Sequence, residues 1–274
     1  MKRVFKWLSA GVLLGVGLFW LLTSSREVQF ERPDSYRPDL ANGELVFHAG
    51  GCASCHGDGL EGGLEMITAF GTFRVPNISP DPGFGIGSWG WNDFLNAMKR
   101  GRSPDGRYYY PAFPYASYAR ATVRDLLDLK AFIDSMPGSQ NAVAGHEISF
   151  PWNLRRGIGL WNRHYLDELP VVPFTPGDKR LQRGRYLVEA LGHCGECHTP
   201  RDRFGGLDRS LWLAGGPNPD GEGRVPNITP HEDGLADWSE PVSYTHLRAH
   251  ETNDLISYAV LCLKRGGGGG GGGG

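Results

Sequence analysis

The feature that most constrains this 274-residue chain is a pentapeptide, Cys-x-x-Cys-His, that occurs twice. The two copies supply Cys52, Cys55 and His56, then Cys194, Cys197 and His198. Two thiols at this spacing can bond the two vinyl groups of one porphyrin, and the adjacent histidine can coordinate its iron. Each copy therefore predicts one covalently attached haem c, with the cysteines bound to the porphyrin and the histidine as the proximal iron ligand.

Two other interpretations of paired cysteines fit the spacing less well. A zinc ribbon usually places its two Cys-x-x-Cys pairs about 15–20 residues apart. Here the pairs begin at residues 52 and 194, a separation of 142 positions, and each carries its own histidine. A redox Cys-x-x-Cys suits a thioredoxin-like βαβ pattern, which is not found around either copy. Haem attachment is the interpretation that uses all six residues.

The two motifs lie in an internal repeat. Arg-Val-Pro-Asn-Ile follows the first motif at residues 74–78 and the second at residues 224–228. A tryptophan comes next in both copies, Trp89 in the first and Trp238 in the second. Self-similarity on this scale indicates two homologous domains rather than a short-period solenoid.

These segments carry a resemblance to a known family. The haem motifs, the two Pro-Asn-Ile segments, Tyr-Pro-Ala-Phe-Pro-Tyr at 110–115 and the residues flanking the second motif are similar to those of diheme, membrane-bound cytochromes c. Such proteins resemble the cytochrome subunits of periplasmic alcohol, aldehyde and sugar dehydrogenases. The resemblance covers roughly residues 38–240. It implies a mostly α fold with two tandem class I cytochrome c domains behind an N-terminal transmembrane anchor.

The expected organisation has five parts. They are a signal-anchor or transmembrane helix at 1–25, cytochrome c domain 1 at 38–138, an inter-domain linker at 139–182, cytochrome c domain 2 at 183–240, and a tail at 241–274. Within domain 1 a helix is expected from Trp91 to Lys99, stopping at Gly101. Another should open at Thr122, which has the pattern of a helix cap, and end before Pro137. Gly- and Pro-rich loops are expected to wrap the haem between them.

The N-terminus predicts a membrane anchor. Lys2, Arg3 and Lys6 precede a sixteen-residue apolar run from Trp7 to Leu22, which is about 24 Å of helix and slightly short of a hydrocarbon core of roughly 30 Å. A cleaved signal peptide is the alternative, but no small-x-small cleavage site follows the run. The basic end should face the cytoplasm, which places the protein in the inner membrane with its haem domains in the periplasm.

The C-terminal tail has an unusual composition. Back-translated, the text from Pro241 resembles a sequencing-library adapter read in frame, and Gly266–Gly274 resemble a poly-G read failure. A genuine flexible glycine tail is the alternative. Cys262 lies in this tail. Domain 2 is therefore expected to be truncated, and its natural continuation should supply a closing helix and a methionine.

The expected sixth ligand of the first haem departs from the family pattern. In the family a methionine commonly stands in a Tyr-Pro-Ala-Met-Pro-Tyr segment, but this chain has Phe113 at that position. Met98, 42 residues after His56, is the tentative sixth ligand of the first haem. Met66, a histidine or a vacant position are alternatives, and Met98 could instead be a core residue. A methionine ligand would raise the potential, whereas a vacant position would admit small ligands.

The expected function is one-electron transfer through two haem c groups and their iron, from a periplasmic dehydrogenase to a quinone or a terminal oxidase. The chain would then be an electron-transfer protein or subunit and not itself an enzyme. A diheme enzyme of the peroxidase type is the alternative that Phe113 keeps open, and a haem-based gas sensor is a third. The formal net charge is −2, and nothing in the sequence indicates nucleic-acid binding, which calls for a basic patch.

Overall fold

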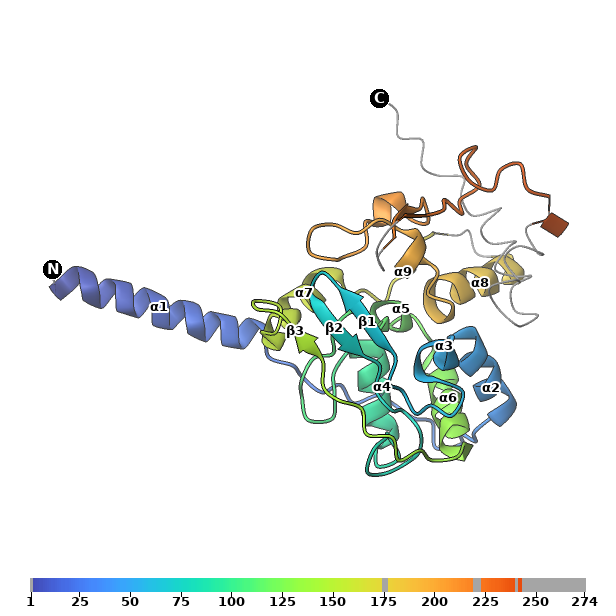
Figure 1. Ribbon diagram of the computed structural model, residues 1–274, viewed down its shortest axis with the longest axis horizontal. Coiled ribbons are helices and arrows are strands. Elements are labelled where there is room, and N and C mark those ends of the chain that lie inside the picture. The colour runs from blue at the N-terminus through green and yellow to red at the C-terminus, as the bar shows by residue number, and fades with distance from the viewer. Residues whose placement is uncertain (1, 174–176, 219–222, 240, 243–274) are drawn as a thin grey trace.

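The structure is a computed structural model that describes residues 2–173, 177–218, 223–239 and 241–242. Most of its regular structure is helical, as predicted (Figure 1). The helices are α1 (Lys2–Leu22), α2 (Leu40–Ala49), α3 (Cys52–His56), α4 (Trp91–Arg100), α5 (Tyr115–Tyr118), α6 (Val123–Ser135), α7 (Ile158–Tyr165), α8 (Lys179–Tyr186) and α9 (Gly195–His198). The described residues also form η1 (Arg155–Gly157), the π-helical η2 (Leu187–Leu191) and η3 (Arg209–Leu211). Apart from Pro241 and Val242, the adapter-like tail with Cys262 lies outside the described residues.

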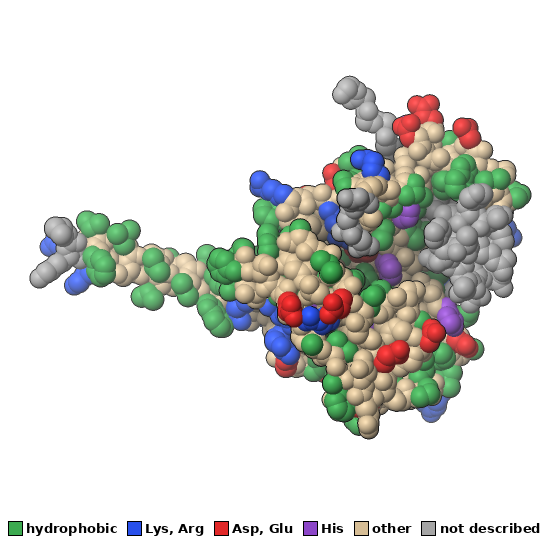
Figure 2. Space-filling model, viewed as in Figure 1, with side chains coloured by type: hydrophobic (Ala, Val, Ile, Leu, Met, Phe, Trp, Pro, Cys, Tyr) green, Lys and Arg blue, Asp and Glu red, His purple; other side chains and the backbone are tan. Residues whose placement is uncertain are grey.

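Helix α1 projects away from the body of the molecule, and hydrophobic side chains follow its surface (Figures 1 and 2). Of the residues described, Arg3–Leu22 form one helix long and apolar enough to cross a membrane, and none of it is buried in the protein. The helix starts before the apolar run, so its 20 residues reach about 30 Å, the thickness of a hydrocarbon core. A signal sequence has the same length and composition.

Helices α2 and α6 form the main helix pair of the first half, as in Figure 1. The caps of both follow from local sequence: Asp39 accepts a hydrogen bond from the Asn42 amide at 3.0 Å. Thr122 accepts one from the Asp125 amide at 3.1 Å, which confirms the predicted start of α6. Where the helices meet, a Cβ atom added to Gly43 would lie 2.2 Å from the carbonyl oxygen of Asp128. Only glycine allows the two backbones to approach this closely.

A fully buried carboxylate, Asp128, joins the chain before α2 to α6. Its Oδ1 accepts from the Tyr36 hydroxyl at 2.5 Å and from the Asp39 amide at 3.0 Å. Its Oδ2 accepts from the Asn42 side-chain amide at 2.9 Å. Burial and this hydrogen bond to a carboxylate raise the pKa of Tyr36 well above its ordinary value, so the phenol remains a donor. Three donors thus compensate the burial of one carboxylate.

We expect Asp128→Asn to lower the free energy of unfolding by about 1–3 kcal/mol, because an amide nitrogen replaces one acceptor and leaves a buried donor unpaired. Glu44→Gln provides the control, since Glu44 is an exposed acid on α2 and its loss should change stability by no more than about 0.5 kcal/mol. Denaturant unfolding of the haem-loaded protein, followed by circular dichroism, measures both. Equal stabilities of the two variants would contradict the role of Asp128.

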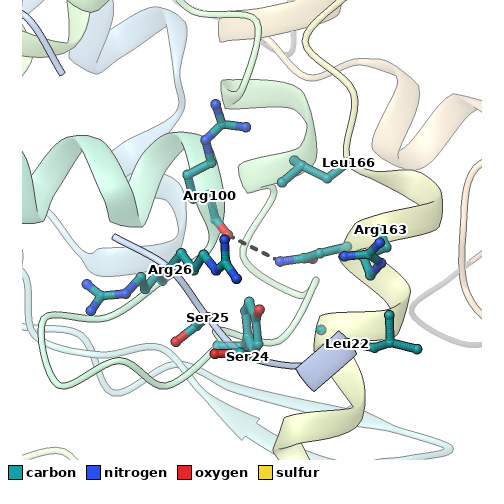
Figure 3. A pocket seen from close by; sticks show the side chains of 11 residues that line it. Leu22, Ser24, Ser25, Arg26, Arg100, Arg163 and Leu166 are labelled. Atoms are coloured by element: carbon teal, nitrogen blue, oxygen red, sulfur yellow. Dashed lines mark hydrogen bonds between the residues drawn. The ribbon is translucent and has the colours of Figure 1, made fainter. Parts of the chain in front are cut away.

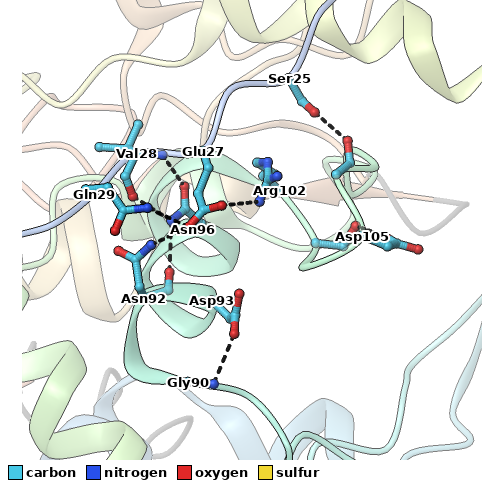
Figure 4. A network of polar contacts seen from close by, with 12 residues as sticks. Ser25, Glu27, Val28, Gln29, Gly90, Asn92, Asp93, Asn96, Arg102 and Asp105 are labelled. Carbon is cyan, nitrogen blue, oxygen red and sulfur yellow. Dashed lines mark hydrogen bonds and ion pairs between the residues drawn. The ribbon is translucent and has the colours of Figure 1, made fainter.

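The segment that follows α1 is held against α4 (Figure 4). The amide of Val28 donates to Asn96 Oδ1 at 2.9 Å, and the Asn96 side chain donates back to the Val28 carbonyl at 2.8 Å. Asn92 repeats the pattern one turn earlier: its Oδ1 accepts from the Phe30 amide at 3.1 Å and its Nδ2 donates to Glu27 at 2.7 Å. Two asparagine side chains therefore bind the segment much as a neighbouring strand would.

Helix α4 starts at the predicted Trp91 and ends at Arg100, one residue later than predicted and just before Gly101. The Gly90 amide donates to Asp93 at 3.0 Å at its start. At its end the chain turns at Gly101, whose φ of +58° favours glycine. Its buried face includes Phe94, Leu95 and Met98.

Short antiparallel strands occur where only loops were predicted. They are β1 (Glu65–Thr68), β2 (Gly71–Arg74) and β3 (Glu147–Ile148) in one sheet, and β4 (Gly216–Pro217) and β5 (Arg224–Val225) in another. Glu65 lies opposite Arg74 across β1 and β2. The Arg74 guanidinium binds Glu65 at 2.7 Å and Glu147 at 2.8 Å, so it ties the three strands together.

Residues 139–182 contact both halves of the chain. Asn162 on α7 accepts from the buried Tyr115 hydroxyl at 2.7 Å, which reaches the first half. Trp161 donates to the Phe204 carbonyl at 3.1 Å, which reaches the second. Asp167 also binds Arg209 at 2.6 Å. This segment thereby fixes the second half against the first, and the domain limits given above stay a prediction.

Candidate haem sites

The first Cys-x-x-Cys-His motif forms helix α3, and the second forms α9 together with Cys194, the helical-conformation residue just before it. Because residues three apart share one face of a helix, the two thiols of a motif point the same way. Cys52 and Cys194 are half-buried, whereas Cys55 and Cys197 are exposed. Both motifs thus have one sulfur against the protein and one at the surface.

The two motif histidines have the same hydrogen-bond partner. His56 Nδ1 lies 2.8 Å from the Pro76 carbonyl, and His198 Nδ1 lies 2.9 Å from the Pro226 carbonyl. A carbonyl can only accept, which assigns the proton to Nδ1 and leaves the Nε2 lone pair for a metal. Burial also lowers the pKa of His56, and this favours the neutral imidazole that a metal requires.

The Pro-Asn-Ile repeat holds these carbonyls in place. Asn77 Oδ1 accepts from the Ser79 amide at 2.9 Å, and Asn227 Oδ1 accepts from the Thr229 amide at 2.8 Å. The isoleucine amides donate to Leu60 and Leu213 at 2.9 and 3.0 Å, and both leucines have positive φ, 59° and 62°. The repeat is therefore the support of the motif histidine, a role that the sequence reasoning missed.

Two glycines allow the chain after each motif to return to this support. A Cβ atom on Gly62 would lie 2.5 Å from the Pro76 carbonyl carbon, and one on Gly215 would lie 2.7 Å from that of Pro226. Their φ values are +68° and +74°. Their amides donate to the carbonyls of the motif histidines at 2.8 and 2.7 Å. No residue with a side chain fits either position.

Apolar clusters surround both motifs. In the first half, Cys52 packs against a cluster that includes Leu60, Ile86, Met98 and Tyr118. In the second, Cys194 packs against a smaller cluster of Val188, Leu213, Ile228 and Leu235. Two thiols on one face, an imidazole protonated on Nδ1 and an apolar lining are the donors and surroundings that a covalent haem needs, so the residues present fit the group.

Met98 lies on α4 within the apolar cluster of the first half. Phe113 packs against the same cluster, with its ring centroid 5.7 Å from Tyr109 and 5.9 Å from Tyr118. Met66 instead lies on β1, opposite Phe73 of β2. Met98 thus belongs to the apolar cluster against which Cys52 packs. Its role as the sixth iron ligand stays a prediction.

The two motifs are close together because α5 lies between them. The Tyr118 hydroxyl donates at 2.8 Å to the carbonyl of Gly50, which precedes the first motif. The Tyr118 ring also packs edge-on against His193, which precedes the second, with centroids 5.6 Å apart. Ser117 donates to Glu196, inside the second motif, at 2.7 Å. His193 therefore supports the contact between the motifs, and burial lowers its pKa.

Across the described ranges, no three His, Cys, Asp or Glu side chains converge as a metal-binding group. The cysteine pairs that a zinc ribbon would bring together lie instead on α3 and α9, each beside its own histidine and its own proline carbonyl.

Comparison with known proteins gives the class. Residues 40–137 match the cytochrome c family model. The chain is 45% identical over 241 residues to a diheme cytochrome c-type of Cereibacter sphaeroides, a match that covers 80% of this chain and 78% of that protein. The chain belongs to the cytochrome c family. It is accordingly an electron-transfer protein that carries covalent haem c and iron, as predicted, rather than a catalytic enzyme.

Other relatives are subunits of larger assemblies. The chain is 33% identical over 226 residues to the fructose dehydrogenase cytochrome subunit of Gluconobacter japonicus. This match covers 80% of this chain and 46% of that protein. It is 35% identical over 225 residues to the cytochrome c subunit of the quinone alcohol dehydrogenase of Gluconobacter oxydans, covering 77% of this chain and 46% of that protein. The chain spans about half the length of these two relatives.

Proposed function

We propose that the chain transfers single electrons through two haem c groups, one on each motif. The observation that carries the proposal is the repetition of one arrangement: a Cys-x-x-Cys-His turn whose histidine Nδ1 is bound by a proline carbonyl at 2.8 Å in one half and 2.9 Å in the other. Cys52 and Cys55 would hold the first haem, and Cys194 and Cys197 the second. His56 and His198 would be the proximal ligands, and Met98 the sixth ligand of the first haem.

When bound, haem supplies a one-electron iron couple. The chain's own residues fix and insulate it. The proline carbonyls orient the imidazoles and raise their basicity, and the apolar clusters keep water from the half-buried cysteines. Cys55 and Cys197 are exposed, so each motif reaches the surface where a redox partner can approach. The contact through Tyr118 favours electron exchange between the motifs.

The proposed donor is a periplasmic dehydrogenase, and the proposed acceptor is a quinone or a terminal oxidase. The names of several relatives support this choice, including the gluconate 2-dehydrogenase cytochrome c subunit of Pantoea cypripedii, 36% identical over 215 residues. We further propose that α1 anchors the chain in the inner membrane with the haem domains in the periplasm. Its 20-residue apolar stretch and the basic Arg3 and Lys6 support that orientation.

A reductive titration of the full chain, matured with haem, tests the proposal. We expect two electrons to be taken up per chain, and we expect the haem on the first motif to be low-spin in both oxidation states. Peroxide turnover together with a high-spin band and rapid cyanide binding would instead favour the peroxidase alternative. Uptake of a single electron would show that one motif is not a haem site.

A further inference from the structure

An open pocket of about 270 Å³ lies where α1 meets the body of the molecule. Leu22, the last residue of α1, forms one side of it, and Arg26, Arg100, Arg102 and Arg163 line the rest together with serine and tyrosine hydroxyls (Figure 3). None of these residues belongs to either haem motif. The pocket is thus a second functional candidate, with a strongly basic lining.

The arginines exceed the carboxylates that neutralise them. Arg100 binds Glu168 at 2.6 Å, and Arg102 lies 4.0 Å from Glu27. Arg26 and Arg163 make no ion pair with the residues that the structure describes. The buried Nε atoms of Arg100 and Arg102 also have no hydrogen-bond partner in that part of the chain. Unused donors and a net positive charge favour an anion, and guanidinium groups match phosphate oxygens in pairs.

The pocket has a fixed position relative to α1. The Arg156 guanidinium donates to the Trp20 carbonyl at 2.8 Å and lies 3.8 Å from the centroid of the Trp20 ring. Thr23 is fully buried, and a Cβ atom on Gly159 would lie 2.8 Å from its Cα. The asparagines of α4 hold the next residues (Figure 4). With α1 across a bilayer, this places the arginines just beyond the hydrocarbon core, at the level of lipid headgroups, where tryptophan is also enriched.

We propose that this pocket binds the phosphate of an anionic phospholipid headgroup in the periplasmic leaflet. The inference rests on the proposed membrane anchor and is independent of the haem assignment. Arg26 and Arg163 would supply the free guanidinium donors, while the paired Arg100 and Arg102 keep the lining positive. Leu22 would contact the first carbons of the acyl chains. A quinone ring would find little apolar surface among these side chains.

The test uses the full haem-loaded chain in nanodiscs of phosphatidylcholine with phosphatidylglycerol as the anionic lipid. Native mass spectrometry after mild release counts the phosphatidylglycerol molecules retained per chain. We expect retention to weaken about tenfold or more in Arg26→Gln with Arg163→Gln, because charge-assisted hydrogen bonds contribute that much. The control pair Lys179→Gln with Arg180→Gln removes the same charge from the exposed start of α8 and should retain lipid as the wild type does.

Three results would overturn the inference. One is equal lipid retention by the Arg26/Arg163 variant and the wild type. Another is displacement of the lipid by millimolar inorganic phosphate, which would identify a soluble phosphate as the ligand. The third is an intact mass showing that α1 has been removed. Haem content and reduction are measured on the same samples, so a failure of the electron-transfer proposal is separate from a failure of the lipid site.

Discussion

Replacing both cysteines of the first motif, Cys52→Ala with Cys55→Ala, is expected to halve the covalent haem of the chain, from two groups to one. Each thioether bond needs one thiol, so the variant can form neither bond at the first motif, whereas the second motif has its own pair of thiols and its own support for His198. The remaining haem should keep its spectrum, because the smaller apolar cluster around Cys194 contains no residue of the first motif. Intact mass and the alkaline pyridine spectrum give the haem count per chain.

The matched variant Cys194→Ala with Cys197→Ala should also carry one haem, and the variant lacking all four thiols should carry none. Ser54→Ala changes an exposed position inside the first motif and should leave two haems in place. Two haems in either double-cysteine variant would contradict the assignment. A double-cysteine variant with no haem at all would show that the motifs are loaded only together.

A valine at Gly43 is expected to cause the largest loss of stability among the substitutions considered. Its Cβ would lie 2.2 Å from the Asp128 carbonyl oxygen and 2.8 Å from Phe132 Cβ, and the first of these is backbone that cannot rotate away. Overpacking in a filled core costs about 1–3 kcal/mol and occasionally more. Separating α2 from α6 would also break the bonds to Asp128, so we expect a loss of about 3 kcal/mol or more.

Gly145→Val is the control, since a Cβ atom there meets nothing within 4 Å. Denaturant midpoints of the two variants, followed by circular dichroism, should differ clearly, with Gly145→Val close to the wild type. If Gly43→Val unfolded at the wild-type midpoint, the close contact of α2 and α6 would be wrong. Loss of the native Soret spectrum at a lower denaturant concentration is a further expected consequence, because α2 leads directly into the first motif and the haem stays attached while its surroundings unfold.

The elements with local determinants could be predicted from the sequence. Thr122 caps α6 and Gly101 ends α4, because capping depends on residues within one turn. The strands were not predictable: β1, β2 and β3 are short, and β3 joins β2 from a segment more than seventy residues further along the chain. The ion pairs of Arg74 with Glu65 and Glu147 also join segments that are distant in the sequence, so they required the fold.

In the candidate site, too, the features set by local sequence were predictable and those set by tertiary contacts were not. The cysteines and histidines of the motifs carry their chemistry in five consecutive residues, so sequence alone identifies them. The partners of those residues depend on tertiary contacts. The Pro76 carbonyl is separated from His56 by 20 positions, and Gly50 is separated from Tyr118 by 68. The repeated Pro-Asn-Ile was visible in the sequence, yet a backbone carbonyl leaves no side-chain signature, so its role in binding the histidine required the fold.

The hydrogen bonds between residues 25–30 and α4 bear on how the protein would meet its redox partners. A carrier on a long, unbonded linker sweeps a wide volume above its membrane and can shuttle between distant partners. Here residues 25–30 are hydrogen-bonded to the body and form no flexible linker after α1. A membrane-anchored molecule would therefore hold its two motifs at a constant height above the membrane and at a constant tilt. Encounters with a redox partner would then depend on lateral diffusion in the bilayer plane. A partner could exchange electrons only if its own redox centre lay at the same height above the membrane as one of the motifs.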